Sequence, residues 1–476
     1  MRLRLRGLTL GAMLSSGLLF VCTLAPTLLW GDDAMFQHAL AVGELTNHPL
    51  WGLLARLFAL LPLTDFALKA NLISAICAMG AVAVLVQVSL ALGASPRAAL
   101  LSGIALAVSH TFWLQSVRAE VYTLHLLLFL TGLWAILKWR RCPQRWGWLL
   151  FGLFVWLIGT INHLLMSMAF LGGVWLIVSG IPSRSYRYLL PALAGLAAMG
   201  LLAVAAVPGF FATVIPGSAR VVLESFRFSP RWVLAHLALL VYQAPALVLL
   251  AVPGVRRLWR SDHQAAIGLL LIAVPTVVFA ATHGILEAYV FYLPAYALLA
   301  LAIGLGSDIL SRRWSGARWS LTLLAVLCLH LSIYRLTPAI LEHFAPGLIY
   351  ARDLPGRPAN LFFLWPPKRG YTGARWFAET ALRLVPANAV LVADWTPYAP
   401  LRYLQDVEGI RQDVSIIMPD APGDLCLRTL RESDGARALF LANADARYYP
   451  LSEIERYWQL VPEGPIYALL PRGENP

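Results

Sequence analysis

Long apolar runs with almost no charge dominate this sequence and limit what it can fold into. Runs of about 18 residues or more are typical of membrane-spanning helices. Only 13% of the 476 residues are charged, whereas ordinary globular chains carry about 25%. We therefore expect a polytopic all-α membrane protein with about eleven transmembrane helices. The expected spans are 8–29, 70–93, 98–117, 121–138, 147–162, 164–181, 188–207, 231–254, 265–282, 289–306 and 319–337.

One stretch, 147–181, allows two interpretations, one long helix or two short ones. Asn162 and His163 lie at its middle, where two polar residues would be costly inside a bilayer. A turn at the interface is the cheaper arrangement. We also expect the first apolar run to remain as a helix, since no small-x-small cleavage site precedes Asp32.

Basic residues predict the orientation of these spans. With eleven spans, the Arg and Lys clusters at 2–6, 138–145, 184–187, 256–260 and 312–318 all fall on one side. The positive-inside rule makes that side the cytoplasm. The net charge of +12 therefore reflects topology and does not indicate nucleic-acid binding. We expect a bacterial inner-membrane protein with a cytoplasmic N-terminus and a periplasmic C-terminal domain.

The chain changes character after the last apolar run. Short β-type runs at 389–393 and 415–418 alternate with helical stretches at 372–384 and 451–459. We expect a membrane domain over 1–338 and an extracytoplasmic α/β domain over 339–476, which is long enough for its own core.

The first outer loop, 31–69, begins with two adjacent carboxylates. Its apolar residues are spaced for helices that lie on the membrane surface, and Gly43, Pro49 and Pro62 divide it. Asp32 and Asp33 allow two interpretations. They are catalytic acids, or they serve the start of a helix, where Asp is favoured.

Other ionisable and polar residues gather at outer membrane ends. Singly, each fits an interfacial anchor, but as a set they favour a shared outward-facing pocket. The candidate substrate-binding residues are His48 and Arg56 in the first loop, Arg118, Glu120, Tyr122 and His125 in the second, Asn162 and His163 in the third, and Glu287 and Tyr292 in a later one.

An outer-face acid beside a membrane cavity suits transfer of a sugar from a polyprenyl phosphate. Asp32 or Asp33 would act as general base on an acceptor hydroxyl. Arg118 or Arg56 would stabilise the departing phosphate, and His48 or His125 would hydrogen-bond the donor. No nucleotide-binding motif is present. The spacing of Asp32, Asp33 and Glu120 gives only weak support for a divalent metal, so the sequence assigns no cofactor with certainty and leaves a divalent metal open.

Four stretches resemble one known family. They are WGDDAMFQHALAVGELTNHPLWGLLARLFALLP, ALAVSHTFWLQSVRAEVYTLHLLL, LEAYVFYLPAYALLALAIGLG and VPANAVLVADWTPYAPLRYLQDVEGIRQDVSII. The family is the protein O-mannosyltransferase-like group of the GT-C membrane glycosyltransferases. The resemblance spreads over nearly the whole chain.

The resemblance implies a GT-C fold, a lipid-phosphate sugar donor and a catalytic acid at Asp32. It places Glu120, Tyr122, His125 and His48 on family motif positions. The chain departs from the family at Met35, where a second acid is usual, so Asp33 is expected to replace it.

In the C-terminal domain, the resemblance covers Asp394, Tyr403, Gln405, Gly409 and Asp413. We expect these residues to hold the domain together through turns and caps. The domain itself is expected to bind the acceptor or to close over the active site.

The expected function is therefore an inverting glycosyltransferase. Its partners would be membrane lipids, a lipid-linked sugar donor, with mannose as one candidate sugar, and an extracytoplasmic acceptor (a protein Ser/Thr, a lipid or a glycan). Two other hypotheses stay open. A transporter or flippase of lipid-linked intermediates would place ionisable residues at the bilayer midplane. A non-enzymatic envelope assembly factor would act through its C-terminal domain alone.

Overall fold

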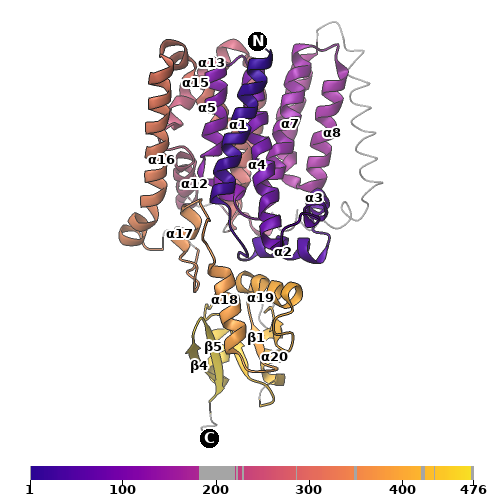
Figure 1. Ribbon diagram of the computed structural model, residues 1–476, viewed down its shortest axis with the longest axis vertical. Coiled ribbons are helices and arrows are strands. Elements are labelled where there is room, and N and C mark those ends of the chain that lie inside the picture. The colour runs from indigo at the N-terminus through magenta and orange to yellow at the C-terminus, as the bar shows by residue number, and fades with distance from the viewer. Residues whose placement is uncertain are drawn as a thin grey trace.

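The computed structural model describes residues 2–181, 220, 223–227, 230–285, 287–347, 351–419, 424–433 and 435–472. The expected span 188–207, the basic cluster 184–187 and most of the loop 208–230 lie outside these residues. Figure 1 shows a bundle of helices with a smaller mixed domain at the end opposite the N-terminus.

Six helical segments of the described chain are long and apolar enough to cross a membrane, or seven if one bent pair counts as a single span. The helices α1 (Arg2–Thr23), α4 (Phe66–Ala91), α7 (Tyr122–Arg141), α14 (His263–Thr282), α15 (Leu293–Arg313, preceded by the short η5, Ala288–Tyr292) and α16 (Gly316–Phe344) provide the six. The helical membrane architecture is confirmed, and the count of eleven stays a prediction.

The expected span 98–117 is not one continuous helix, because it consists of two helices. α5 (Pro96–Ala107) and α6 (His110–Ser116) bend by 68°. The backbone groups freed at the bend find partners, as they must inside a membrane. The hydroxyl of Tyr334 donates to the Val108 carbonyl at 3.2 Å, and the Thr111 N–H donates to the Gln243 side chain at 2.8 Å.

Two further apolar stretches are also divided, the first of them as expected. The stretch 147–181 breaks at His163 between α8 (Trp146–Asn162) and η1 (Leu164–Ala169), with α9 (Phe170–Gly180) following. The turn that we expected at Asn162-His163 is therefore present. The stretch 231–254 divides into α12 (Pro230–Tyr242), η4 (Val248–Leu250) and α13 (Ala251–Ser261). Pro245 has no N–H to continue the first of these helices.

The first outer loop forms two short helices at the end of the bundle that faces the C-terminal domain, α2 (Asp32–Val42) and α3 (Pro49–Ala59). α2 ends at Gly43, which has a φ of 75° in the left-handed region that glycine adopts without strain. α3 begins with Pro49 in its first turn, a favoured position. The expected helices of this loop are confirmed.

The C-terminal region contains a five-stranded sheet in the order β2-β1-β3-β5-β4. β1 (Val390–Val392) lies parallel to β2 (Ser415–Ile417) and β3 (Leu439–Leu441), whereas β4 (Trp458–Glu463) and β5 (Ile466–Pro471) form an antiparallel hairpin. The two expected strands are thus confirmed as β1 and β2. The helices around them are α17 (Ala359–Leu364), α18 (Gly373–Leu384), α19 (Trp395–Glu408), α20 (Asp424–Ser433) and α21 (Leu451–Tyr457).

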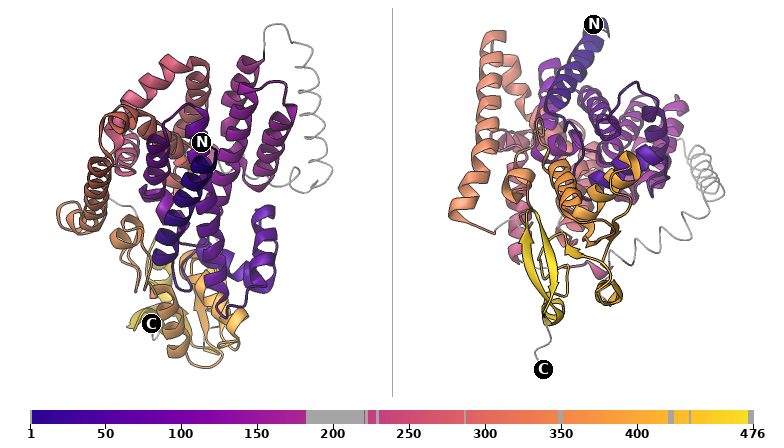
Figure 2. Two further views of the ribbon diagram at one scale, coloured as in Figure 1. Left: turned by 45° about the horizontal axis from the view of Figure 1, so that its top comes forward. Right: turned by 60° about the horizontal axis from the view of Figure 1, so that its bottom comes forward.

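The C-terminal domain packs directly on the first outer loop. The Gly31 N–H donates to the Thr396 carbonyl at 3.1 Å, and His38 and Asp406 lie 2.9 Å apart. Arg375 donates to the hydroxyl of Thr27 at 2.9 Å. All three views place α18 and α19 against this end of the bundle (Figures 1 and 2).

Helices α13 and α15 approach so closely that glycine is required between them. A Cβ at Gly254 would lie 1.8 Å from the Ala302 carbonyl oxygen, and one at Gly306 would lie 1.8 Å from the Leu250 carbonyl oxygen. Because both obstacles are backbone atoms, the helices themselves would have to separate.

Gly254→Ala should therefore lower the melting temperature of the purified protein, with a cost of about 1–3 kcal/mol for overpacking. Gly147→Ala is the matched control, because a Cβ at this exposed helical glycine meets nothing within 4 Å. Thermal unfolding in detergent measures both variants. Equal melting temperatures for the two would contradict the close packing.

Candidate functional site

The acidic pair opens α2 at the point where the chain leaves α1 and turns along the membrane end. Gly31, with a φ of 53°, precedes the helix, and Asp32 and Asp33 occupy its first turn. Acidic side chains there complement the helix dipole. Neither of them caps the helix with a side-chain hydrogen bond, so the helix-start interpretation explains only part of their presence.

Arg118 is the centre of a buried ionic cluster. Its guanidinium lies 3.2 Å from Asp33, 3.0 Å from Glu120 and 2.8 Å from Glu287. Arg118, Asp33 and Glu120 are each 2% exposed, while the Glu287 side chain is 34% exposed. The four residues come from three separate loops, and the cluster therefore ties those loops together at one end of the spans.

The cluster holds more acids than cations, and burial makes that costly. Burial raises the pKa of Asp33 to about 7, against the opposing charge of Arg118. Burial also raises the pKa of Glu120. The cluster consequently keeps protons at a pH where ordinary carboxyl groups have lost them.

Asp32 differs from Asp33 in its access to solvent. Its side chain is exposed and accepts a 2.6 Å hydrogen bond from the indole Nε1 of Trp395 in the C-terminal domain. Desolvation by the surrounding protein and the charge of Glu287 raise the pKa of Asp32, while the Trp395 hydrogen bond and Arg118 oppose the rise. Asp32 is accessible to a substrate hydroxyl from solvent, whereas Asp33 is buried.

A group of aromatic and imidazole rings lies beside the ionic cluster. His163 stacks on His48 at 5.1 Å and packs against Tyr122 and His125, both at 5.4 Å between ring centroids. The Asn162 carbonyl oxygen lies 2.6 Å from Nδ1 of His48. Burial lowers the pKa of His48 and of His163. The structure thus brings five of the expected residues into one ring cluster.

His125 keeps unused hydrogen-bonding capacity in that cluster. Its ring is fully buried, and neither nitrogen has a hydrogen-bond partner within the part of the chain that the structure describes. A buried imidazole without a partner is costly, and a ligand hydroxyl would remove that cost.

Two expected residues lie apart from both clusters. Arg56 is exposed on α3 and forms no ion pair with any described residue. Tyr292 is buried against Tyr296 and His236, with ring centroids 5.5 Å and 5.4 Å away. The structure does not place Arg56 where it would contact a phosphate held at Arg118.

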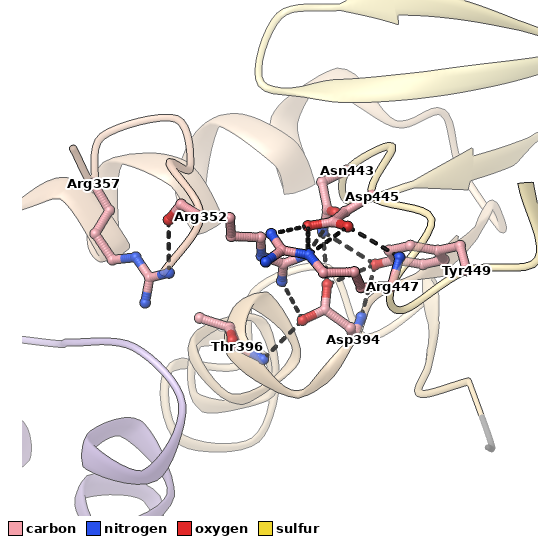
Figure 3. Close-up of polar contacts among 8 residues, drawn as sticks. All are labelled: Arg352, Arg357, Asp394, Thr396, Asn443, Asp445, Arg447 and Tyr449. Carbon is pink, nitrogen blue, oxygen red and sulfur yellow. Dashed lines mark hydrogen bonds and ion pairs between the residues drawn. The ribbon is translucent and has the colours of Figure 1, made fainter. Parts of the chain in front are cut away.

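Asp394 lies in a polar network of the C-terminal domain, shown in Figure 3. Its carboxylate pairs with Arg352 and accepts hydrogen bonds from Asn443 at 2.6 Å and Tyr449 at 3.0 Å. Asp394 also caps α19 by accepting from the Thr396 N–H at 3.2 Å. These contacts satisfy the carboxylate within the domain, and they support the expected structural role of Asp394.

The C-terminal region contributes residues to this site that the sequence did not predict. Trp395 stands in one of the motif stretches without an expected role, yet it contacts Asp32. Lys368 and Arg357 were not predicted either, although both are buried near the acids. The sequence WPPKRG, in which Lys368 follows two prolines, was the one pattern that could have pointed to Lys368.

No group of three or more His, Cys, Asp or Glu side chains in the described ranges is arranged to hold a metal ion. Asp33 and Glu120 are instead both paired with the guanidinium of Arg118, at 3.2 Å and 3.0 Å.

The sequence comparison agrees with the resemblance carried by the motifs. Residues 34–184 match the family model of the protein O-mannosyl-transferase TMEM260 N-terminal domain. The matched segment begins directly after Asp33 and includes Arg118, Glu120 and the ring cluster. The suspected resemblance to this family is confirmed. A search of curated proteins gives no match.

Solved structures show the same fold over nearly the whole chain. ArnT from Cupriavidus metallidurans, in the apo state, has a TM-score of 0.56 at 14% identity and covers 97% of both chains. The same protein bound to undecaprenyl phosphate has a TM-score of 0.57 at 13% identity, again over 97% of both chains.

The archaeal oligosaccharyltransferase AglB from Archaeoglobus fulgidus is also similar. Its complex with an inhibitory peptide and a dolichol-phosphate has a TM-score of 0.53 at 12% identity, over 98% of this chain and 74% of that chain. At such identities the likeness shows the fold alone, which this chain shares with ArnT and AglB. The apolar helices of this fold are those of a multi-pass membrane protein.

The raised pKa of Asp33 predicts how stability depends on pH. A carboxyl whose pKa rises from 3.8 to about 7 on folding holds its proton more tightly in the native state. The contribution of this carboxyl to the free energy of unfolding is present at low pH and is lost as the pH rises from 3.8 to about 7. Asp33→Asn should therefore flatten the fall in melting temperature between about pH 4 and 7.

Glu44→Gln is the control for that measurement, because Glu44 is an exposed carboxylate of the same loop. It should follow the wild-type curve. If Asp33→Asn and wild type gave parallel curves, Asp33 would not carry the raised pKa.

Proposed function

We propose that this protein is an inverting glycosyltransferase that moves a sugar from a polyprenyl phosphate to a hydroxyl group outside the cytoplasm. The observation that carries the proposal is an exposed carboxylate, Asp32, next to a buried Arg118 cluster at the end of the membrane spans. A lipid-linked phosphate sugar presents its head group at that depth.

The proposed reaction is one displacement. Asp32 takes the proton of the acceptor hydroxyl as that oxygen forms a bond to the anomeric carbon. The bond from the anomeric carbon to the phosphate oxygen breaks, and its electron pair leaves with the polyprenyl phosphate. Buried cations near the phosphate stabilise the charge that develops. Asp33 and Glu120 act differently from Asp32, because their contacts with Arg118 position that cation.

The position of the ionisable groups favours this enzyme over a transporter. Arg118 and Glu120 precede the start of α7, and Glu287 precedes the η5–α15 span. A transport site would be expected near the middle of the spans. The family match also supports mannose as the first sugar to test and a protein Ser or Thr as the first acceptor.

An apolar cavity of about 220 Å³ supports a lipid donor. It lies between α12, α13, α14 and α15, and its lining runs along α15 from Ala295 to Leu305. The lining contains no charged residue, as a prenyl chain requires. The proposal places part of the donor tail there.

Asp32→Asn should lower kcat by about 10²- to 10⁴-fold, the usual worth of a general base, and leave donor affinity nearly unchanged. The assay follows a radiolabelled polyprenyl-phosphate sugar with purified protein in lipid. Asp406→Asn is the matched control, since it removes another carboxylate from the same α2–α19 interface. Transfer at the wild-type rate by Asp32→Asn would end this assignment of the base.

Trp395→Phe should move the acid limb of the pH–rate profile to higher pH. The Trp395 hydrogen bond lowers the pKa of Asp32, and without it the base needs a higher pH to lose its proton. The pH dependence of kcat over KM measures this shift. A profile that falls in height but keeps its position would mean that Trp395 only orients the loop.

A further inference from the structure

Two buried cations lie on the connector, which we define as residues 351–371 between α16 and α18. Lys368 is 2% exposed and Arg357 is 6% exposed. Among the residues that the structure describes, neither forms an ion pair with a carboxylate. Buried lysine and arginine are almost always paired, so both need an explanation.

Lys368 lies where the connector meets the end of α1. Its backbone N–H donates to the Thr23 carbonyl at 2.8 Å, and its ammonium group donates to the carbonyl oxygens of Trp365 and Pro366. The charges that act on it most are Arg118, which repels it, and Asp33, which attracts it. Lys368 is therefore a second cation beside the Arg118 cluster.

Arg357 is presented by a tight turn of the connector. The N–H groups of Leu354 and Arg357 donate to each other's carbonyls at 3.1 Å and 2.7 Å, and Gly356 in the turn has a φ of 79°. The guanidinium lies among Trp30, Phe362 and Phe363, 5.4–5.8 Å from their ring centroids.

The guanidinium of Arg357 is also poorly satisfied. One hydrogen bond reaches the Arg352 carbonyl at 3.3 Å, and its Nε has no partner within the described chain. Figure 3 shows this guanidinium apart from the Asp394 carboxylate, with which it forms no hydrogen bond or ion pair. The negative charges of Glu287 and Asp394 attract the guanidinium of Arg357 from a distance.

The connector is fixed to the first outer loop, which keeps both cations near Asp32. Tyr371 donates to the Gly356 carbonyl at 2.9 Å and accepts from the indole of Trp30 at 2.7 Å. Trp30 precedes the Gly31-Asp32-Asp33 turn by one residue. The two cations thus flank the start of α2 from the side of the C-terminal domain.

Two buried cations without an ion pair among the described residues are energetically unfavourable. Burial lowers the pKa of Lys368 and of Arg357, which reflects the cost of an uncompensated charge. Carbonyl contacts and aromatic faces offset only part of that cost. An anion with more than one negative charge would offset the rest, and a phosphate monoester offers several acceptor oxygens as well.

We propose that Lys368 and Arg357 form an anion site for the phosphate monoester of the polyprenyl phosphate that remains when the sugar has left. This inference rests on the proposed function and extends it, since it assigns the binding of the leaving group to the connector. Arg118 is paired with three carboxylates and serves to position the residues of the site. Lys368 and Arg357, which have no ion pair among the described residues, bind the phosphate.

The test measures binding by the purified full-length protein in detergent. The probes are a polyprenyl phosphate, the polyprenol of the same length and inorganic phosphate. Wild type should bind the polyprenyl phosphate more tightly than the polyprenol. Lys368→Met and Arg357→Met should each reduce that preference by about 10- to 100-fold, the worth of a hydrogen bond to a charged group.

Arg369→Met is the matched control, because Arg369 is the exposed neighbour of Lys368 and carries the same charge. It should keep the full preference. Without ligand, Lys368→Met should melt no lower than wild type, since it removes an uncompensated buried charge. A lower melting temperature with an unchanged preference would assign Lys368 a structural role only and overturn the proposal.

The remaining outcomes separate this inference from the proposed function. A wild type that prefers the phosphate, with both variants unchanged, would overturn the connector site and leave the enzyme intact. Inorganic phosphate binding as tightly as the polyprenyl phosphate would overturn the lipid source. No preference for phosphate in wild type would overturn both the site and the proposed donor.

Discussion

The ionic cluster around Arg118 is the interaction on which the site depends. One guanidinium joins Asp33 on α2, Glu120 before α7 and Glu287 before η5. These residues are far apart in the chain, and their pairing fixes three loops at one end of the membrane spans. Removing one partner from such a buried cluster leaves uncompensated charge, so the arrangement is either complete or strongly destabilised. The Arg118 cluster fixes the start of α2 and therefore the position of the exposed Asp32.

The C-terminal domain completes the site, because its elements cover the first outer loop. Trp395 holds Asp32, Thr396 holds Gly31, and the connector places Lys368 and Arg357 beside them. The Asp394 network keeps the start of α19 in shape, and α19 carries Trp395. A structural network in the domain is thereby linked to the orientation of the proposed base, with no direct role in the chemistry.

Periodicity and composition predicted the membrane helices, the two outer-loop helices and the strands β1 and β2, because these depend on local apolar patterns. The break at Ser109 and the divided stretch 231–254 were missed, since the backbone groups at the break are satisfied by Tyr334 and Gln243 from distant helices. At the site, the sequence pointed to Arg118 and its acids as outer-end residues. It could not assign exposure to Asp32 and burial to Asp33, because that difference arises when α19 and the connector pack on α2.

Direct displacement of polyprenyl phosphate, with Asp32 as the base, is the central claim. The anomeric configuration of the product tests it most directly, because a single displacement inverts that centre and a covalent enzyme intermediate retains it. Nuclear magnetic resonance of the product formed from a donor of known configuration gives the answer, and we expect inversion. Retention would mean that a carboxylate attacks the sugar as a nucleophile, and it would contradict the proposed roles of Asp32 as a base and Asp33 as a positioning residue.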